Sequence, residues 1–170
     1  MLNSSSEILS PHWLYKLAAN LSIPDVGMVG ATASYESLAF LNRAFPKFPN
    51  IHIRTNAFMI ARALFCNLTK GVAIADKMDA HLLESGPDSL SQQVLSMGKE
   101  ILVVGRNGRG YSPPLWPTSG TFRLGNQENL LISDNRTRQF SSTSPGEKEF
   151  TVHRTWGRYK TRIPDLNFSP

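Results

Sequence analysis

The run EILVVG, residues 100–105, constrains the fold of this chain more than any other segment. Its successive apolar residues are mostly β-branched and lie between a charged residue and a glycine, which predicts a buried strand. The preceding segment, residues 88–97, has helical spacing and ends at Gly98. Asn107-Gly108, which follows the run, is typical of a tight turn. The sequence therefore predicts a helix, a buried strand and a turn in direct succession.

Helices and strands also alternate in the rest of the chain. The prolines of FPKFPN, residues 45–50, predict a loop, because each proline disfavours helix in the residue before it. This alternation predicts the α/β class, with a mixed sheet flanked by helices. By spacing and composition, we expect helices over residues 11–21, 34–45 and 74–85. We expect strands over residues 26–31 and within 129–135. Residues 51–65 are expected to form a strand that passes into a helix near Ile60.

The first of these helices has a clear start signal. Ser10 offers a capping hydroxyl, and Pro11 suits the first helical position. Trp13, Leu14 and Leu17 then follow at helical spacing. We therefore expect a helix that packs by one face containing all three side chains.

The length of 170 residues suits one domain with a substantial core. We expect residues 1–140 to carry the folded elements, after a frayed lead-in over residues 1–9. The C-terminal part is expected to be rich in loops, and residues 141–170 to form a loop and a poorly ordered basic tail. Trp156 is the residue of this tail that we expect to pack against the body.

The net charge narrows the class of partner. A formal net charge of +5 favours anionic partners such as phosphate esters, nucleic acid or acidic lipid, and does not choose between them. The arginine-glycine pattern GRNGRG, residues 105–110, occurs once, whereas nucleic-acid binding by such motifs needs repetition and nearby aromatic residues. We therefore expect no nucleic-acid partner.

The chain shows no sign of insertion into a membrane or of secretion. Its apolar stretch over residues 57–65 is short and contains Arg62, so we expect no transmembrane segment. The start MLNSSSEILSPHW has no basic region followed by an apolar run. The single cysteine, Cys66, excludes an internal disulfide and is expected to be a buried, inert thiol. We expect a cytoplasmic protein, with peripheral attachment to a membrane as the alternative.

Three segments together resemble sugar-nucleotide-dependent glycosyltransferases of the GT-A, family 2-like type. SPHWLYKLAANLSIPDVGMVGATAS is similar to a Pro-x-Trp-Leu helix followed by an Asp-Val-Gly-x-Val-Gly strand in that family. IHIRTNAFMIARALF is similar to its acceptor-side strand and helix, and LLESGPDSLSQQVLSMGKEILVV to the segment with an acidic residue before a helix, a glycine and a strand. The residues in the first pattern are Pro11, Trp13, Leu14, Asp25, Val26, Gly27, Val29 and Gly30.

The resemblance extends over residues 10–108 and implies a partial GT-A-like fold. The family's metal-binding Asp-x-Asp motif and nucleotide-binding half have no counterpart before Ser10, so the chain resembles the acceptor-side half. The implied partners are a nucleotide-sugar donor, a glycan or lipid-linked hydroxyl acceptor, and a separate nucleotide-binding half. The implied cofactor is Mn²⁺ or Mg²⁺ in the complete enzyme, with none bound by this chain alone. The alternative is a non-catalytic carbohydrate- or partner-binding domain with the same half-fold.

Glu84 is the first candidate for the catalytic base that the resemblance implies. Transfer to a hydroxyl needs a carboxylate that takes the acceptor's proton. Glu84 lies at a predicted helix end, before a Gly86-Pro87 break that would expose it at a cleft edge. The alternative is an ordinary solvated glutamate. Asp88 either competes for the same role or caps the following helix, for which Ser89 is the other candidate cap.

Arg54, Thr55 and Asn56 are candidate acceptor-binding residues. They follow an apolar strand, and polar groups at strand ends commonly contact ligands in α/β folds. Their side chains would hydrogen-bond sugar hydroxyls or a phosphate. The alternative is that they only form the turn between the strand and the next helix.

The remaining candidates are aromatic and basic residues further along the chain. Trp116 is expected either to stack on the apolar face of an acceptor sugar or to anchor the core. Arg106 and Arg109 would hold a phosphate or diphosphate, or be solvated in a hairpin turn. The resemblance also implies a late metal-binding histidine, for which His153 is the candidate.

Overall fold

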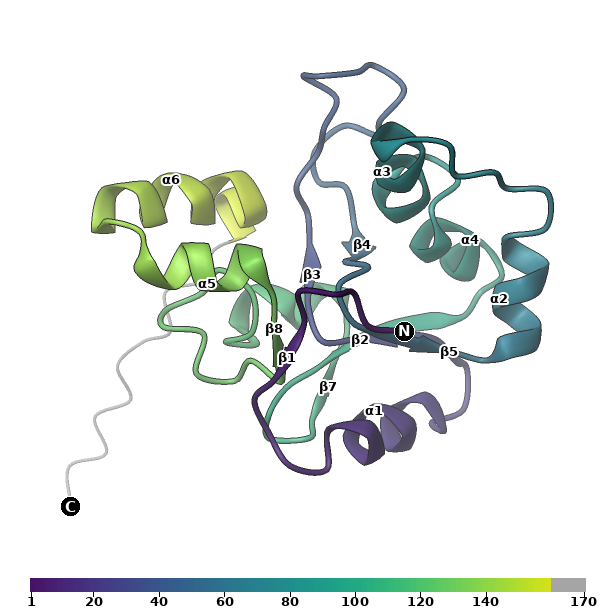
Figure 1. Cartoon of the computed structure of the whole chain (residues 1–170), viewed down its shortest axis with the longest axis horizontal. Coiled ribbons are helices and arrows are strands. Elements are labelled where there is room, and N and C mark those ends of the chain that lie inside the picture. Colours follow the sequence, from purple (N-terminus) through teal and green to yellow (C-terminus); the bar gives the residue numbers. More distant parts are fainter. Residues whose placement is uncertain (160–170) are drawn as a thin grey trace.

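A four-stranded sheet with the order β5-β2-β6-β7 lies at the centre of the computed structural model (Figure 1). The structure describes residues 1–159. β2 (Val26–Gly30) and β6 (Glu100–Val104) pair in parallel. β5 (Phe58–Ile60) pairs antiparallel with β2, and β7 (Gly110–Tyr111) pairs antiparallel with β6. The strands expected from the two apolar runs are therefore confirmed, and they form the middle of one sheet.

The side chains of β6 alternate between the two faces of this sheet, as strand geometry requires. Ile101 and Val103 contribute to one apolar cluster, together with Val94 of the helix that precedes the strand. Leu102 and Val104 contribute to a second cluster with Leu17. Both faces of the sheet are thus covered, which explains why the run contains no polar residue after Glu100.

Helices cover the two faces. α1 packs beside the second cluster through Leu17, and α4 packs against the first through Leu90 and Val94. Within residues 1–159, no helix is long and apolar enough to cross a membrane. The helices before β6 are α1 (Trp13–Leu21), α2 (Arg62–Leu68), α3 (Lys77–Ser85) and α4 (Leu90–Ser96).

Two short antiparallel ladders flank the main sheet. β3 (Ala33–Ser34) pairs with β4 (His52–Ile53). β1 (Glu7–Ile8) pairs with β8 (Ile132–Ser133), so the N-terminal segment is tied to a strand more than a hundred residues away. The expectation of a frayed lead-in is therefore wrong for the residues of β1.

The C-terminal part contains more helix than expected. η1 (Pro113–Thr118) follows β7, and α5 (Asn135–Ser142) follows β8. α6 (Pro145–Trp156) and the short η2 (Gly157–Tyr159) come next. The loop expected from residue 141 onward is therefore wrong over α6. The rest of the expected basic tail, residues 160–170, lies outside the described residues.

Local capping explains why α6 forms. Ser144 and Glu147 make a reciprocal capping box, and Pro145 occupies the first turn, where its missing N–H costs nothing. At the other end, Trp156 is fully buried, and its Nε1 donates to the Phe122 carbonyl at 3.0 Å. The expectation that Trp156 packs against the body is confirmed.

The helix expected over residues 34–45 does not form. Ser34 belongs to β3, and the Tyr35 ring packs edge-on against Trp156 at 5.2 Å between centroids. Glu36 forms ion pairs with Arg123 and Arg154. Contacts with residues about ninety to 120 positions away thus hold this segment in an irregular loop, and they override its helical spacing.

Two short helices expose residues that were expected to be buried. Leu14 on α1 is 53% exposed, and Cys66 on α2 is also exposed. α1 begins at Trp13, after His12 in a left-handed conformation (φ 57°), with no side-chain cap from Ser10. Within α1, Leu17 is buried in the core as expected and Leu14 is not.

Candidate functional site

Glu84 and Thr55 meet although they lie on different elements. Glu84 is in the last turn of α3, which starts with a capping box formed by Asp76 and Asp79 and ends at Gly86. Thr55 follows β4. The Thr55 backbone N–H donates to Oε2 of Glu84 at 2.7 Å, and the Thr55 hydroxyl donates to the same oxygen.

The half-buried carboxylate of Glu84 is ionised at neutral pH. Burial raises its pKa, but the charge of Arg54, the nearby His52 ring and the two hydrogen bonds from Thr55 lower the pKa below its ordinary value. Both hydrogen bonds engage Oε2. Oε1 makes no hydrogen bond to any residue in the described part of the chain, so one oxygen can accept a proton or a hydrogen bond.

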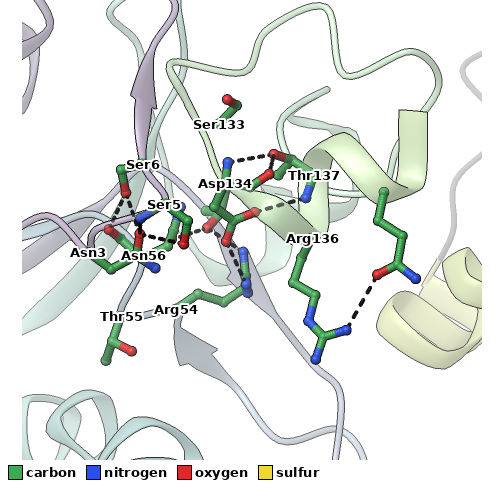
Figure 2. A network of polar contacts seen from close by, with 12 residues as sticks. Asn3, Ser5, Ser6, Arg54, Thr55, Asn56, Ser133, Asp134, Arg136 and Thr137 are labelled. Carbon is green, nitrogen blue, oxygen red and sulfur yellow. Dashed lines mark hydrogen bonds and ion pairs between the residues drawn. The ribbon is translucent and has the colours of Figure 1, made fainter. Parts of the chain in front are cut away.

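The guanidinium group of Arg54 points toward a second carboxylate, that of Asp134 (Figure 2). One terminal nitrogen of its guanidinium donates to Oδ2 of Asp134 at 2.8 Å, and the other donates to the Thr32 hydroxyl at 3.3 Å. The guanidinium carbon also lies 4.3 Å from the centroid of the Phe122 ring. Arg54 is thus fixed by its partners and places its charge between two acidic residues.

Asp134 joins this site to α5. Its side chain is 1% exposed and caps the helix, because Oδ1 accepts from the Thr137 N–H at 2.8 Å. Burial raises the pKa of Asp134, but Arg54 and the bonds from Thr137 lower it below its ordinary value. A buried, ionised aspartate therefore balances the charge of Arg54.

His52, on β4, is buried near the carboxylate of Glu84. Its Nδ1 lies 2.8 Å from the Asn50 carbonyl oxygen, which can only accept, so Nδ1 carries a proton. Burial lowers the pKa of His52 below its ordinary value, although the nearby carboxylate of Glu84 acts in the opposite direction. The ring is therefore neutral at pH 7.

Asn56 differs from its two neighbours in the sequence. It is 2% exposed, and its Oδ1 accepts from the Thr32 hydroxyl at 2.6 Å. Its Nδ2 is buried with no hydrogen-bond partner among the described residues. Arg54, Thr55 and Glu84 therefore lie together, whereas Asn56 supports the turn from inside the fold.

Asp88 does not join this cluster. It is exposed in the loop between α3 and α4, and only its backbone carbonyl has a hydrogen bond in the described structure, from Gln93 Nε2 at 2.7 Å. Ser89, not Asp88, caps α4 by accepting from the Gln92 N–H. Of the two residues expected as candidate caps, the structure has Ser89, and the capping role considered for Asp88 is wrong.

Trp116 is a core residue. Its side chain is fully buried, and its Nε1 donates to the Tyr111 carbonyl at 2.8 Å. The ring packs near Tyr35, with 6.0 Å between the centroids. Of the two roles expected for Trp116, the structure has the core anchor, and the ring offers no exposed face to a sugar.

Arg106 and Arg109 lie in the turn between β6 and β7, and both are exposed. The turn is closed by the Gly108 N–H, which donates to the Gly105 carbonyl at 2.9 Å. Arg109 lies over the Tyr111 ring at 5.3 Å. Arg106 lines a cavity of about 560 Å³ that also contains Gln127 and Arg138, separate from the Glu84 contacts.

A metal site is not formed by the described residues. Within residues 1–159, no group of three or more His, Cys, Asp or Glu side chains comes together in a way that could hold an ion. His153 is exposed on α6. His153 is therefore not part of such a group among the described residues.

No family model matches the chain, and no curated protein and no solved structure matches it. Glu84 and Arg54–Asn56 are candidates from the sequence, whereas their neighbours Thr32 and His52 are not. The Asp-x-x-Thr spacing of residues 134–137 signals the helix cap. No local signal indicates that the cap also binds an arginine eighty positions earlier.

Proposed function

We propose that this chain forms the acceptor side of a GT-A-like glycosyltransferase that uses a nucleotide-sugar donor, and that Glu84 is its general base. The observation that carries the proposal is the contact between Thr55 and Glu84. Two segments that resemble the acceptor side of this family, 29 positions apart, meet at one carboxylate. A glutamate that is simply solvated would accept hydrogen bonds from water, whereas Glu84 accepts them from the backbone N–H and the hydroxyl of Thr55.

The state of Glu84 suits proton abstraction. The two bonds from Thr55 orient the carboxylate through Oε2 and leave Oε1 without a hydrogen bond to the described residues. A sugar hydroxyl would donate to Oε1. As its oxygen attacks the anomeric carbon, the new glycosidic bond forms, the bond to the departing diphosphate breaks with its electron pair, and the proton passes to Oε1.

The position of the cluster in the fold also supports the proposal. β2 and β6 are parallel, so their carboxyl ends lie at the same edge of the sheet. Thr32 follows β2, and its hydroxyl and carbonyl both contact Arg54. Ligands in open α/β sheets bind at the carboxyl ends of the strands.

The proposal is tested by sugar transfer. The chain would be combined with the nucleotide-binding half of a GT-A glycosyltransferase, supplied as a second polypeptide, and incubated with a panel of labelled nucleotide-sugars, with Mn²⁺, and with mono- and disaccharide acceptors. We expect transfer to at least one acceptor, and a loss of about 10²–10⁴-fold in the rate for Glu84→Gln. The matched control is Glu100→Gln, which changes an exposed glutamate at the start of β6 and should leave the rate unchanged.

The alternative, a non-catalytic carbohydrate-binding domain, makes a different prediction. Saturable acceptor binding without transfer, equal in the wild type and in Glu84→Gln, would favour it and exclude Glu84 as a base. If the chain neither transfers sugar to any acceptor in the panel nor binds one, the result would contradict both functions.

A further inference from the structure

A pocket of about 290 Å³ lies between α5, α6 and the loop after β3. Three guanidinium groups line it, from Arg123, Arg136 and Arg154. Two carboxylates, Glu36 and Glu147, also face it. None of these five residues takes part in the contacts of Glu84, so the pocket is a feature separate from the candidate active site.

The carboxylates do not satisfy the guanidinium groups. Glu36 is shared, since one of its oxygens accepts from Arg123 at 2.9 Å and the other accepts from Arg154. Glu147 accepts from the Ser144 hydroxyl at 2.6 Å and thereby caps α6. The pocket therefore has one positive charge more than it has negative charges.

Arg136 contributes most of the unused donors. It extends from the first turn of α5 (Figure 2), and its hydrogen bond, to Gln139 Oε1, is long at 3.4 Å. Its other N–H groups have no partner among the described residues. A guanidinium group offers five N–H donors in a planar fork that suits carboxylate and phosphate oxygens.

Arg123 is held firmly in place at the inner side of the pocket. Its side chain is 15% exposed, and its Nε is buried without a partner among the described residues. Its backbone is in the left-handed region (φ 51°), which a non-glycine residue rarely adopts and which often marks functional positions. Burial lowers the pKa of Arg123 despite Glu36, and the nearby charges of Arg54 and Arg136 lower it further.

We propose that this pocket binds a phosphate group, with Arg136 and Arg154 as its outer donors and Arg123 behind them. A phosphate oxyanion would lie against the crowded guanidinium groups and accept several N–H donors at once. Phe140 and Phe150 also line the pocket, so an apolar or ring-bearing group attached to the phosphate would lie against them. The inference does not depend on the proposed transferase function.

Calorimetric titration with inorganic pyrophosphate at constant ionic strength tests this site. We expect saturable binding to the wild-type chain and affinity lower by about tenfold or more in Arg136→Gln, since charge-assisted hydrogen bonds are lost. The matched control is Arg62→Gln, which removes an exposed arginine on α2 and the same net charge. Equal weakening by both variants, or no saturable binding to the wild type, would overturn the proposal.

A second variant tests the charge balance in the opposite direction. Glu147→Gln removes a negative charge from the pocket wall and should strengthen pyrophosphate binding, whereas a purely structural network would show no such gain. Glu84→Gln should leave the affinity unchanged, so failure of this site and failure of the transferase proposal are distinguishable. Uridine diphosphate and geranyl diphosphate, titrated separately, show whether the phosphate belongs to a nucleotide or to a lipid.

Discussion

At the scale of single residues, Thr55 controls both the position and the charge of Glu84. Its N–H and its hydroxyl bind one oxygen of the carboxylate, and both bonds favour the ionised form. The backbone bond does not depend on the side chain. The hydroxyl can therefore be removed while the fold at the end of β4 is retained.

Thr55→Val removes that hydroxyl with little change in shape. We expect the pKa of Glu84 to rise toward its ordinary value and the free energy of unfolding to fall by about 1.5 kcal/mol, since one hydrogen bond to a charged group is lost. Carbon NMR of the glutamate side chains gives the pKa, and urea unfolding gives the stability. Thr118→Val is the control at an exposed threonine. An unchanged Glu84 pKa would contradict the assigned contact.

His52 makes stability depend on pH near neutrality. Its pKa is lower in the folded chain than in the unfolded chain, so the unfolded state binds the proton more readily. The contribution of His52 to stability is therefore present above about pH 6.5 and is lost as the pH falls from there through the lowered pKa of the folded chain. Glu84 and Asp134, whose pKa values are also lowered, add a further loss below about pH 4.5.

Thermal unfolding between pH 8 and pH 3 measures this dependence. We expect the melting temperature to fall in two stages as the pH decreases, and His52→Asn to remove the upper stage. A wild-type melting temperature that stays constant from pH 7 to pH 5 would show that His52 is not kept neutral by burial.

At the scale of the elements, prediction succeeded where the signal is local. The strands β2 and β6 follow from uninterrupted apolar runs, and α3 and α4 end at the expected glycines or glycine-proline break. Helix α6 was missed although its capping box and Pro145 are local signals. The loop over residues 34–45 was missed because its partners are not local. Glu36 and Tyr35 are held by residues of the C-terminal region, and those partners are distant in the sequence.

Helix α6 should stabilise the molecule strongly. Trp156, at its end, is fully buried among the residues of the main apolar cluster. We expect Trp156→Ala to lower the free energy of unfolding by about 3–5 kcal/mol. Phe150→Ala, at an exposed position of the same helix, should have little effect in the same urea-unfolding experiment. Equal stability of both variants and the wild type would mean that α6 does not belong to the core.

At the scale of the whole molecule, the sequence predicts the α/β class. It names Arg54, Thr55 and Glu84 as site residues, and it also names Asn56, Asp88 and Trp116, which the structure places elsewhere. It does not predict that Asp134 binds Arg54, because helix capping is a local signal and ion pairing across eighty positions is not. The same limit applies to the arginine pocket, whose members come from three separate segments.

The central claim is that acceptor sugars bind where the end of β4 meets the end of α3. Amide chemical shifts of the ¹⁵N-labelled chain, recorded during titration with cellobiose, lactose and chitobiose, test this claim most directly. We expect saturable shifts centred on the amides of Thr55 and Glu84 for at least one of these sugars, and their loss in Glu84→Ala. Shifts confined to other parts of the chain, or no shifts with any sugar, would contradict it.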